Sequence, residues 1–135
     1  MRIARSLLDR IVAQARAEAP HECCGIVGGR DGRAVLLLPA RNARASALAY
    51  EIDGRDLVGI YDQLDEQGLQ VAIIYHSHTR SDPVPSQTDI NLASPFLPDA
   101  VYLIVGVKDP ERDDIRAWHI ADGQFSEAPL EVEEA

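Results

Sequence analysis

Residues 76–89 of this chain read HSHTRSDPVPSQTD. The apolar run Val71–Tyr75 comes directly before them and has the length and composition of a buried β-strand. Pro83–Pro85 stiffens the approach to Ser86, where Ser-Gln-Thr-Asp has the form of a capping box, so a short helix is expected from Ser86 to about Ala93. The stretch therefore predicts a strand, a loop and a helix, with polar side chains at both junctions.

Those polar side chains form a candidate metal site. His76 and His78 project to the same side of an extended chain, and Ser86 and Asp89 share one face of the helix. Three protein ligands, His76, His78 and Asp89, leave a fourth place for water, as in metal-dependent hydrolases. Nitrogen and oxygen ligands favour Zn²⁺, so one zinc per chain is expected. On residue type alone, Asp82 in the loop competes with Asp89 as third ligand.

A hydrolytic site of this kind also needs a general base from elsewhere in the fold. Glu22 is the candidate, because it is a charged residue that opens an otherwise apolar run, Cys23–Gly28. The local sequence gives about equal weight to a solvated strand end at this position. The adjacent Cys23 and Cys24 do not form a disulfide framework and are expected to be small buried thiols in a reducing compartment.

Size and charge narrow the class of protein. The chain has 135 residues, enough for one domain, and a formal net charge of −9, which argues against a nucleic-acid partner. No apolar run approaches the roughly 20 residues that cross a bilayer. The N-terminal pattern is amphipathic and broken by Asp9, Arg10 and Arg16, so no signal peptide is expected. We therefore expect a cytoplasmic protein with no membrane association.

The hydrophobic pattern predicts a single α/β domain over residues 1–128, with a mixed β-sheet and flanking helices. Helices are expected over 5–18, with Ser6 and Asp9 as a capping pair, over 57–64, between an Asp53 cap and a Gly68 stop, and over 86–93. Strands are expected over 22–28, 34–38, 49–52, 71–75, 101–107, 115–120 and 124–126. Residues 129–135 are expected to be a frayed acidic tail.

Two segments resemble one known family. Pro20-His21-Glu22-Cys23-Cys24-Gly25 is similar to the segment that carries the catalytic glutamate in JAMM (MPN-plus) metalloproteases. His76-x-His78, seven residues and Ser86-x-x-Asp89 match that family's metal motif without a gap. The resemblance implies an MPN fold, which is cytidine-deaminase-like, with zinc bound by His76, His78 and Asp89. It also implies Glu22 as general acid/base and Ser86 as hydrogen-bond donor to the oxyanion, although Ser86 could equally only cap its helix.

The compact chain is most similar to small bacterial members that act on ubiquitin-like sulfur-carrier proteins, through Tyr75–Thr79 and Trp118–Gly123. That resemblance implies a zinc-dependent metallo-isopeptidase that cuts the amide bond after a carrier's C-terminal Gly-Gly and releases cysteine. A side-chain-free tail suits a narrow slot, and residues 40–52 are a candidate wall. The alternatives are a peptidase for another ubiquitin-like modifier or thio-metabolite carrier, and a non-cleaving, metal-containing module that binds a tail. The sequence leaves a homodimer open.

Overall fold

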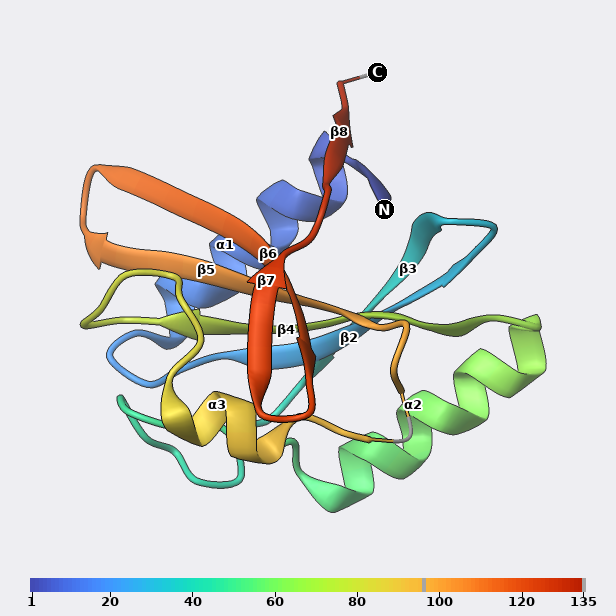
Figure 1. The fold of residues 1–135 in the computed structure, drawn as a ribbon, viewed down its shortest axis with the longest axis horizontal. Helices are drawn as coiled ribbons and strands as arrows, with labels where there is room; N and C mark the ends of the chain where they lie inside the picture. Colours follow the sequence, from blue (N-terminus) through green and yellow to red (C-terminus); the bar gives the residue numbers. More distant parts are fainter. Residues whose placement is uncertain (96, 135) are drawn as a thin grey trace.

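The computed structural model describes residues 1–95 and 97–134 (Figure 1). Its elements in chain order are β1 Arg2–Ala4, α1 Arg5–Glu18, β2 Cys24–Arg30, β3 Arg33–Ala40, α2 Gly54–Gln67, β4 Gln70–His78, α3 Gln87–Leu92, β5 Val101–Asp109, β6 Arg112–Ala121, β7 Gln124–Glu127 and β8 Glu131–Glu133. None of the described helices is long and apolar enough to cross a membrane.

Within the described residues, all eight strands belong to one sheet in the order β7-β6-β5-β4-β2-β3-β1-β8. The β4–β5, β1–β3 and β1–β8 pairs are parallel and the others are antiparallel, so the expected mixed sheet is confirmed. β4 lies in the middle, between β2 and β5. The strand that carries the histidines is therefore held by hydrogen bonds along both edges.

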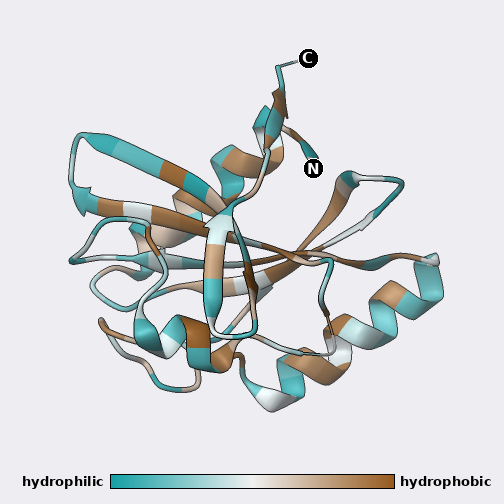
Figure 2. Cartoon of the chain, viewed as in Figure 1, coloured by the Kyte–Doolittle hydropathy of each residue, from teal (hydrophilic) through white to brown (hydrophobic). Residues whose placement is uncertain are grey.

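Apolar side chains cover the sheet on both faces. On one face α1 packs Leu8, Ile11 and Ala15 into a cluster with Tyr75. On the other face α2 contributes Ile60 and Leu64 to a second cluster, and Ile90 of α3 packs at its margin. Figure 2 shows the hydrophobic positions of α1 and α2 turned toward the sheet. Burial on both faces explains why β4 and β5 read as continuous apolar runs.

The structure confirms the predicted ends of α2. The Asp53 side chain accepts hydrogen bonds from the backbone N–H groups of Arg55 and Asp56, and Gly68 has the left-handed backbone, with φ of 64°, that ends a helix without a Cβ clash. The predicted range of α1 is also confirmed, but the capping pair is wrong. The N-cap is Ala4, without a side-chain hydrogen bond, because β1 leads straight into the helix and Ser6 already lies inside it.

Two strand predictions fail because they depend on neighbours distant in sequence. Residues 49–52 form no strand, only an isolated bridge between Asn42 and Ile52, so residues 41–53 are an irregular loop. The expected strand end at residue 38, before Pro39, is also wrong, since β3 runs to Ala40. Beyond Arg33, β3 pairs only with β2 among the described residues, so the proline's missing N–H costs no ladder hydrogen bond on the outer side.

The expectation of a frayed C-terminal tail is wrong for residues 131–133. These residues form β8, which pairs in parallel with β1 in the register Arg2 to Glu131. Glu133 accepts two hydrogen bonds from Arg33, and Glu134 pairs with Arg5. The acidic side chains therefore form ion pairs with arginines from earlier elements. This charge complementarity cannot be predicted from a local sequence pattern.

Candidate metal centre

The end of β4 places two imidazoles on one side of the sheet. His76 lies opposite Cys24 of β2 and Ile104 of β5, so its backbone is fixed from both edges. His76 is fully buried and His78 is 3 % exposed, and their Nε2 atoms lie 3.2 Å apart. The two imidazoles therefore face one another, as the alternation in His-Ser-His predicted, while the buried Ser77 hydroxyl accepts a hydrogen bond from the Cys23 N–H.

α3 brings a carboxylate to the same point. Ser86 and Asp89 form a capping box, in which the Ser86 hydroxyl accepts from the Asp89 N–H at 3.1 Å and the Asp89 carboxylate accepts from the Ser86 N–H at 2.9 Å. Oδ2 of Asp89 also lies 2.9 Å from Nε2 of His78 and 3.2 Å from Nε2 of His76. The cap thus aims the Asp89 carboxylate at the two imidazoles.

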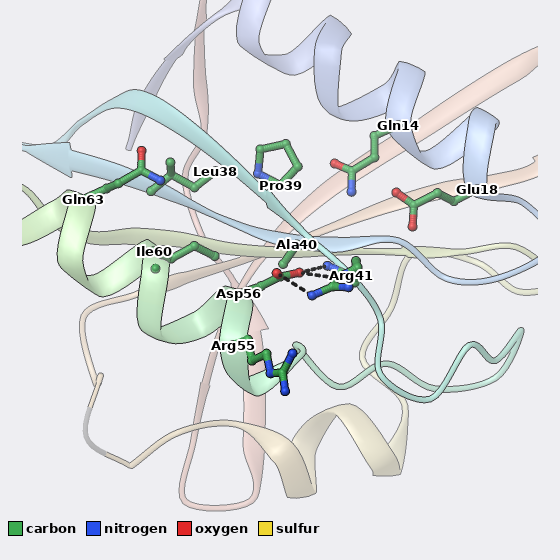
Figure 3. A pocket seen from close by; sticks show the side chains of 11 residues that line it. Gln14, Glu18, Leu38, Pro39, Ala40, Arg41, Arg55, Asp56, Ile60 and Gln63 are labelled. Atoms are coloured by element: carbon green, nitrogen blue, oxygen red, sulfur yellow. Dashed lines mark hydrogen bonds and ion pairs between the residues drawn. The ribbon is translucent and has the colours of Figure 1, made fainter.

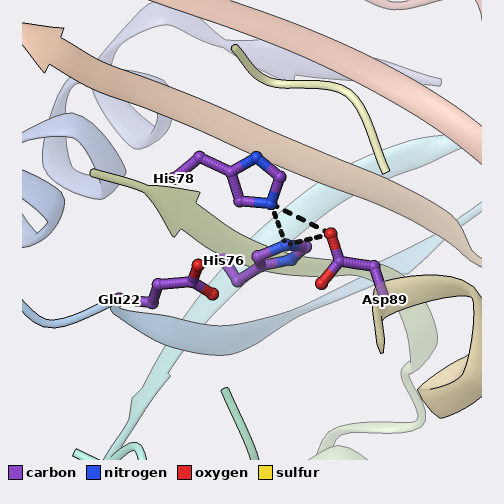
Figure 4. A group of neighbouring side chains, drawn as sticks. All are labelled: Glu22, His76, His78 and Asp89. Carbon is purple, nitrogen blue, oxygen red and sulfur yellow. Dashed lines mark hydrogen bonds and ion pairs between the residues drawn. The ribbon is translucent and has the colours of Figure 1, made fainter. Parts of the chain in front are cut away.

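Glu22 reaches the cluster from the chain segment that enters β2. It is 3 % exposed, so the alternative of a solvated strand end is wrong. The Ser77 hydroxyl accepts from the Cys23 N–H at 2.8 Å, and the Glu22 N–H donates to Ser46 O at 2.7 Å. One ligand atom from each of Glu22, His76, His78 and Asp89 falls within 4.8 Å of the others (Figure 4).

The surroundings of His78 select its tautomer. Its Nδ1 lies 2.8 Å from the Asp82 carbonyl oxygen. A carbonyl only accepts, so Nδ1 carries a hydrogen. Nε2 lies 2.9 Å from Oδ2 of Asp89 and would offer its lone pair only where a metal ion replaces the proton between these two atoms, an arrangement common among metal-ligating histidines. The Asp82 carboxylate is 68 % exposed and pairs with Lys108. Asp82 therefore contributes its carbonyl to the site and is not a competing third ligand.

His76 is held differently. Its ring stacks on Tyr50, with 4.2 Å between ring centroids and an interplanar angle of 18°. Its Nδ1 is buried and has no hydrogen-bond partner among the described residues. Sequence reasoning missed Tyr50 because the residue lies in an irregular loop, where no periodic pattern says which side chains face the sheet.

The titratable groups of the cluster are strongly coupled. Burial raises the pKa of Glu22 to about 8, with His78 acting against the shift and Asp89 adding to it. Burial also acts to raise the pKa of Asp89, but hydrogen bonds from both histidines outweigh it and the pKa is lowered. Burial lowers the pKa of His76. At His78 the bonds to Asp89 and Asp82 outweigh burial, so its pKa is raised.

These residues fit a metal ion. Two imidazole nitrogens and a carboxylate oxygen converge in the combination that zinc prefers. In addition, Oε1 of Glu22 is buried and has no hydrogen-bond partner among the described residues. A buried carboxylate oxygen without a partner is costly unless a cation or a water completes its surroundings. The arrangement therefore brings one possible ligand atom from each of four side chains around a common point.

A separate hollow of about 610 Å³ lies between α1, the end of β3 and α2 (Figure 3). Its wall includes Arg41, whose guanidinium donates two hydrogen bonds to the Asp56 carboxylate. None of the four clustered side chains lines it. It is a polar surface feature, not the site of the candidate chemistry.

The chain is similar to several known proteins. Residues 4–121 match the family described as prokaryotic homologs of the JAB domain. The CysO-cysteine peptidase of Mycobacterium tuberculosis is 35% identical over 98% of this chain and 90% of its own length. The desampylase of Haloferax volcanii is 39% identical over 76% of this chain and 77% of its own. A JAB1/MPN domain protein of Archaeoglobus fulgidus superimposes with a TM-score of 0.63 at 22% identity, covering 99% of this chain and all of that one, which shows the same fold.

Proposed function

Because the chain belongs to the family of prokaryotic JAB-domain (JAMM) proteins, we propose that it is a zinc-dependent metallo-isopeptidase. Its reaction is hydrolysis of the amide bond after the C-terminal Gly-Gly of a ubiquitin-like sulfur-carrier protein, with release of cysteine. One observation carries the proposal: a buried carboxylate with an unpartnered oxygen lies within 4.8 Å of a His-His-Asp ligand set.

His76, His78 and Asp89 would hold one zinc ion, which when bound supplies Lewis acidity to the scissile carbonyl and to the attacking water. The three ligands arrive pre-oriented: the β4 ladder fixes the backbone of both histidines, Asp82 O holds the Nδ1 hydrogen of His78, and the Ser86 cap fixes Asp89. Such preorganisation leaves little side-chain freedom to be lost when the metal binds.

Glu22 is the general acid/base. A carboxylate whose pKa lies near the working pH can accept a proton from the attacking water and return it to the leaving amine nitrogen. Burial places the Glu22 carboxyl in this range, at about 8. Its own N–H donates to Ser46 O of the 41–53 loop, and the N–H of the next residue, Cys23, donates to the Ser77 hydroxyl of β4, so the carboxyl keeps its place during proton transfer.

Ser86 is proposed to donate a hydrogen bond to the oxyanion that forms on the carbonyl. Its oxygen accepts from the Asp89 N–H, and this leaves the hydroxyl hydrogen for donation. The capping role and the oxyanion role are therefore compatible in one side chain. Removal of a comparable donor elsewhere costs about 3–4 kcal/mol in the transition state.

The proposed substrate follows from the relative that cleaves a CysO-cysteine bond and from the site's surroundings. The 41–53 loop lies against the site, since Tyr50 stacks on His76 and Ser46 bonds to Glu22. An extended tail without side chains could pass beside this loop to the cluster, whereas a bulky residue at the cut would not suit so buried a centre. Two buried free thiols suit a reducing cytoplasm as the place of the reaction.

The test uses a purified carrier that ends in Gly-Gly-Cys, with intact mass as the readout. Zinc-loaded protein should remove one cysteine residue, Glu22→Gln should keep its zinc and lose the activity, and His76→Ala should lose both. Unchanged carrier mass together with tight binding would favour a tail-binding module. Cleavage by Glu22→Gln at the original rate would remove Glu22 from its role.

A further inference from the structure

The two histidines of the centre are oriented by different means. His78 donates from Nδ1 to a backbone carbonyl at 2.8 Å, which fixes both its tautomer and the plane of its ring. His76 lacks such a bond within the described part of the chain, because its buried Nδ1 finds no partner. Metal-ligating histidines usually depend on that second hydrogen bond for ring orientation. Something else must set the plane of the His76 ring.

Tyr50 lies where it can do so. Its ring is nearly parallel to the His76 imidazole, with centroids 4.2 Å apart and an angle of 18°. Tyr50 is 6 % exposed and His76 is fully buried, so the stacked pair excludes water from the shared face. Rotation of the imidazole about its Cβ–Cγ bond would break this contact, and stacked aromatic rings attract each other beyond the area they bury.

The loop holds Tyr50 firmly although it has no regular structure. The Asn42 amide donates to Ala49 O at 3.0 Å and accepts from the Glu51 N–H at 3.0 Å, and these two groups flank Tyr50 in sequence. The Ala43 N–H also donates to Glu51 O at 2.7 Å. The peptide units on both sides of the tyrosine are therefore fixed.

The Asn42 side-chain amide also binds the segment that carries Glu22. Nδ2 of Asn42 donates to Glu22 O at 3.0 Å. Its two donors and one acceptor thus connect the backbone of the proposed base with the backbone that carries Tyr50. A displacement of the loop would move both the ring above His76 and the strand entry at Glu22.

We propose that Tyr50 is a positioning residue that sets the plane of the His76 imidazole for metal binding, with the Asn42 amide holding Tyr50 in place. The inference rests on the proposed metal site but not on the identity of the substrate. Tyr50 lies outside the metal motif, and it orients His76 as the Asp82 carbonyl oxygen orients His78.

The experiment measures the dissociation constant for zinc by competition with a chromophoric chelator, and the melting temperature of each metal-free protein. Tyr50→Leu removes the planar face and should weaken zinc binding about 10–100-fold, the usual effect of losing an orienting partner. Tyr50→Phe keeps the face and should stay within about twofold of the original constant. Tyr61→Leu is the matched control, because Tyr61 is 40% exposed and makes no ring contact with either histidine.

A second non-planar variant, Tyr50→Met, is measured in case Tyr50→Leu does not fold. Methionine fills a similar space with a flexible chain. Zinc affinity within twofold of the original in the folded non-planar variants would overturn the inference, and so would an equal loss in Tyr50→Phe. If the unaltered protein binds no zinc, the metal site itself fails. If it binds zinc but cleaves no carrier, the proposed reaction fails while the Tyr50 comparison is still decided.

Discussion

Glu22→Gln should stabilise the metal-free protein at neutral and alkaline pH. Burial raises the pKa of the Glu22 carboxyl in the folded state from its ordinary value of 4.5 to about 8. As the pH rises past 4.5 the unfolded chain releases this proton, while the folded chain keeps it until about pH 8. The unfolded state binds fewer protons in that window, so the contribution of Glu22 to stability is complete below 4.5 and is lost as the pH rises through 8.

The size of the effect follows from the interval between the two pKa values. A shift from 4.5 to about 8 corresponds in full to about 4–5 kcal/mol. Roughly 3 kcal/mol of this develops between about pH 5 and pH 8. Glutamine is nearly the same size, carries no titrating proton and needs no ionised form in the buried site. We therefore compare the free energies of unfolding of the two proteins. The value for Glu22→Gln minus the value for the original protein should rise by about 3 kcal/mol between about pH 5 and pH 8.

The assay is urea unfolding of both chelator-treated proteins at several pH values, with the difference plotted against pH. Titrations that do not depend on Glu22 cancel in that difference, which leaves the Glu22 titration and its interaction with His78. Glu51→Gln controls for the loss of one negative charge, because the Glu51 carboxylate is 59% exposed and belongs to the neighbouring loop. A flat difference for Glu22→Gln would refute the reasoning, since it would mean that the folded protein ionises Glu22 as easily as the unfolded chain does.

Three further substitutions test the supports of the site. Ser77→Ala removes the buried acceptor of the Cys23 N–H and should lower the free energy of unfolding by about 1–3 kcal/mol in urea titrations; no change would mean that water replaces the hydroxyl. Gly25→Ala places a Cβ against the hydroxyl and two ring carbons of Tyr75 and should cost about 1–3 kcal/mol in the same assay, whereas full stability would show that the ring moves freely. Asn42→Asp sets a carboxylate against two carbonyl oxygens and should weaken zinc binding in chelator competition, a result that equal affinity would contradict.

Local signals predicted the parts of the site that are close in sequence. The His76–His78 alternation follows from strand geometry, and the approach of Asp89 follows from the Ser86 cap, because both depend only on adjacent residues. The extent of α2 was also readable, since Asp53 and Gly68 mark its ends by their own chemistry.

Other features depend on partners that no local pattern identifies. The position of Tyr50 above His76 results from the Asn42 hydrogen bonds across an irregular loop, and β8 exists because β1 offers it an edge. Burial of Glu22 could not be decided from its flanking residues, since it depends on the pairing of β2 with β4. Only the family resemblance favoured a Glu22 side chain at the site over a solvated strand end.

The proposed zinc ligands lie within a short stretch of chain, whereas the proposed base is contributed by residue 22, in the distant segment that enters β2. A denatured polypeptide thus retains its His-x-His pair and nearby aspartate as a weak chelating peptide, but it has no means of keeping the glutamate beside them. Affinity of the unfolded ensemble for the ion subtracts from the stabilisation that the ion confers on the native state. Zinc should accordingly raise the melting temperature by less than its native-state dissociation constant alone implies.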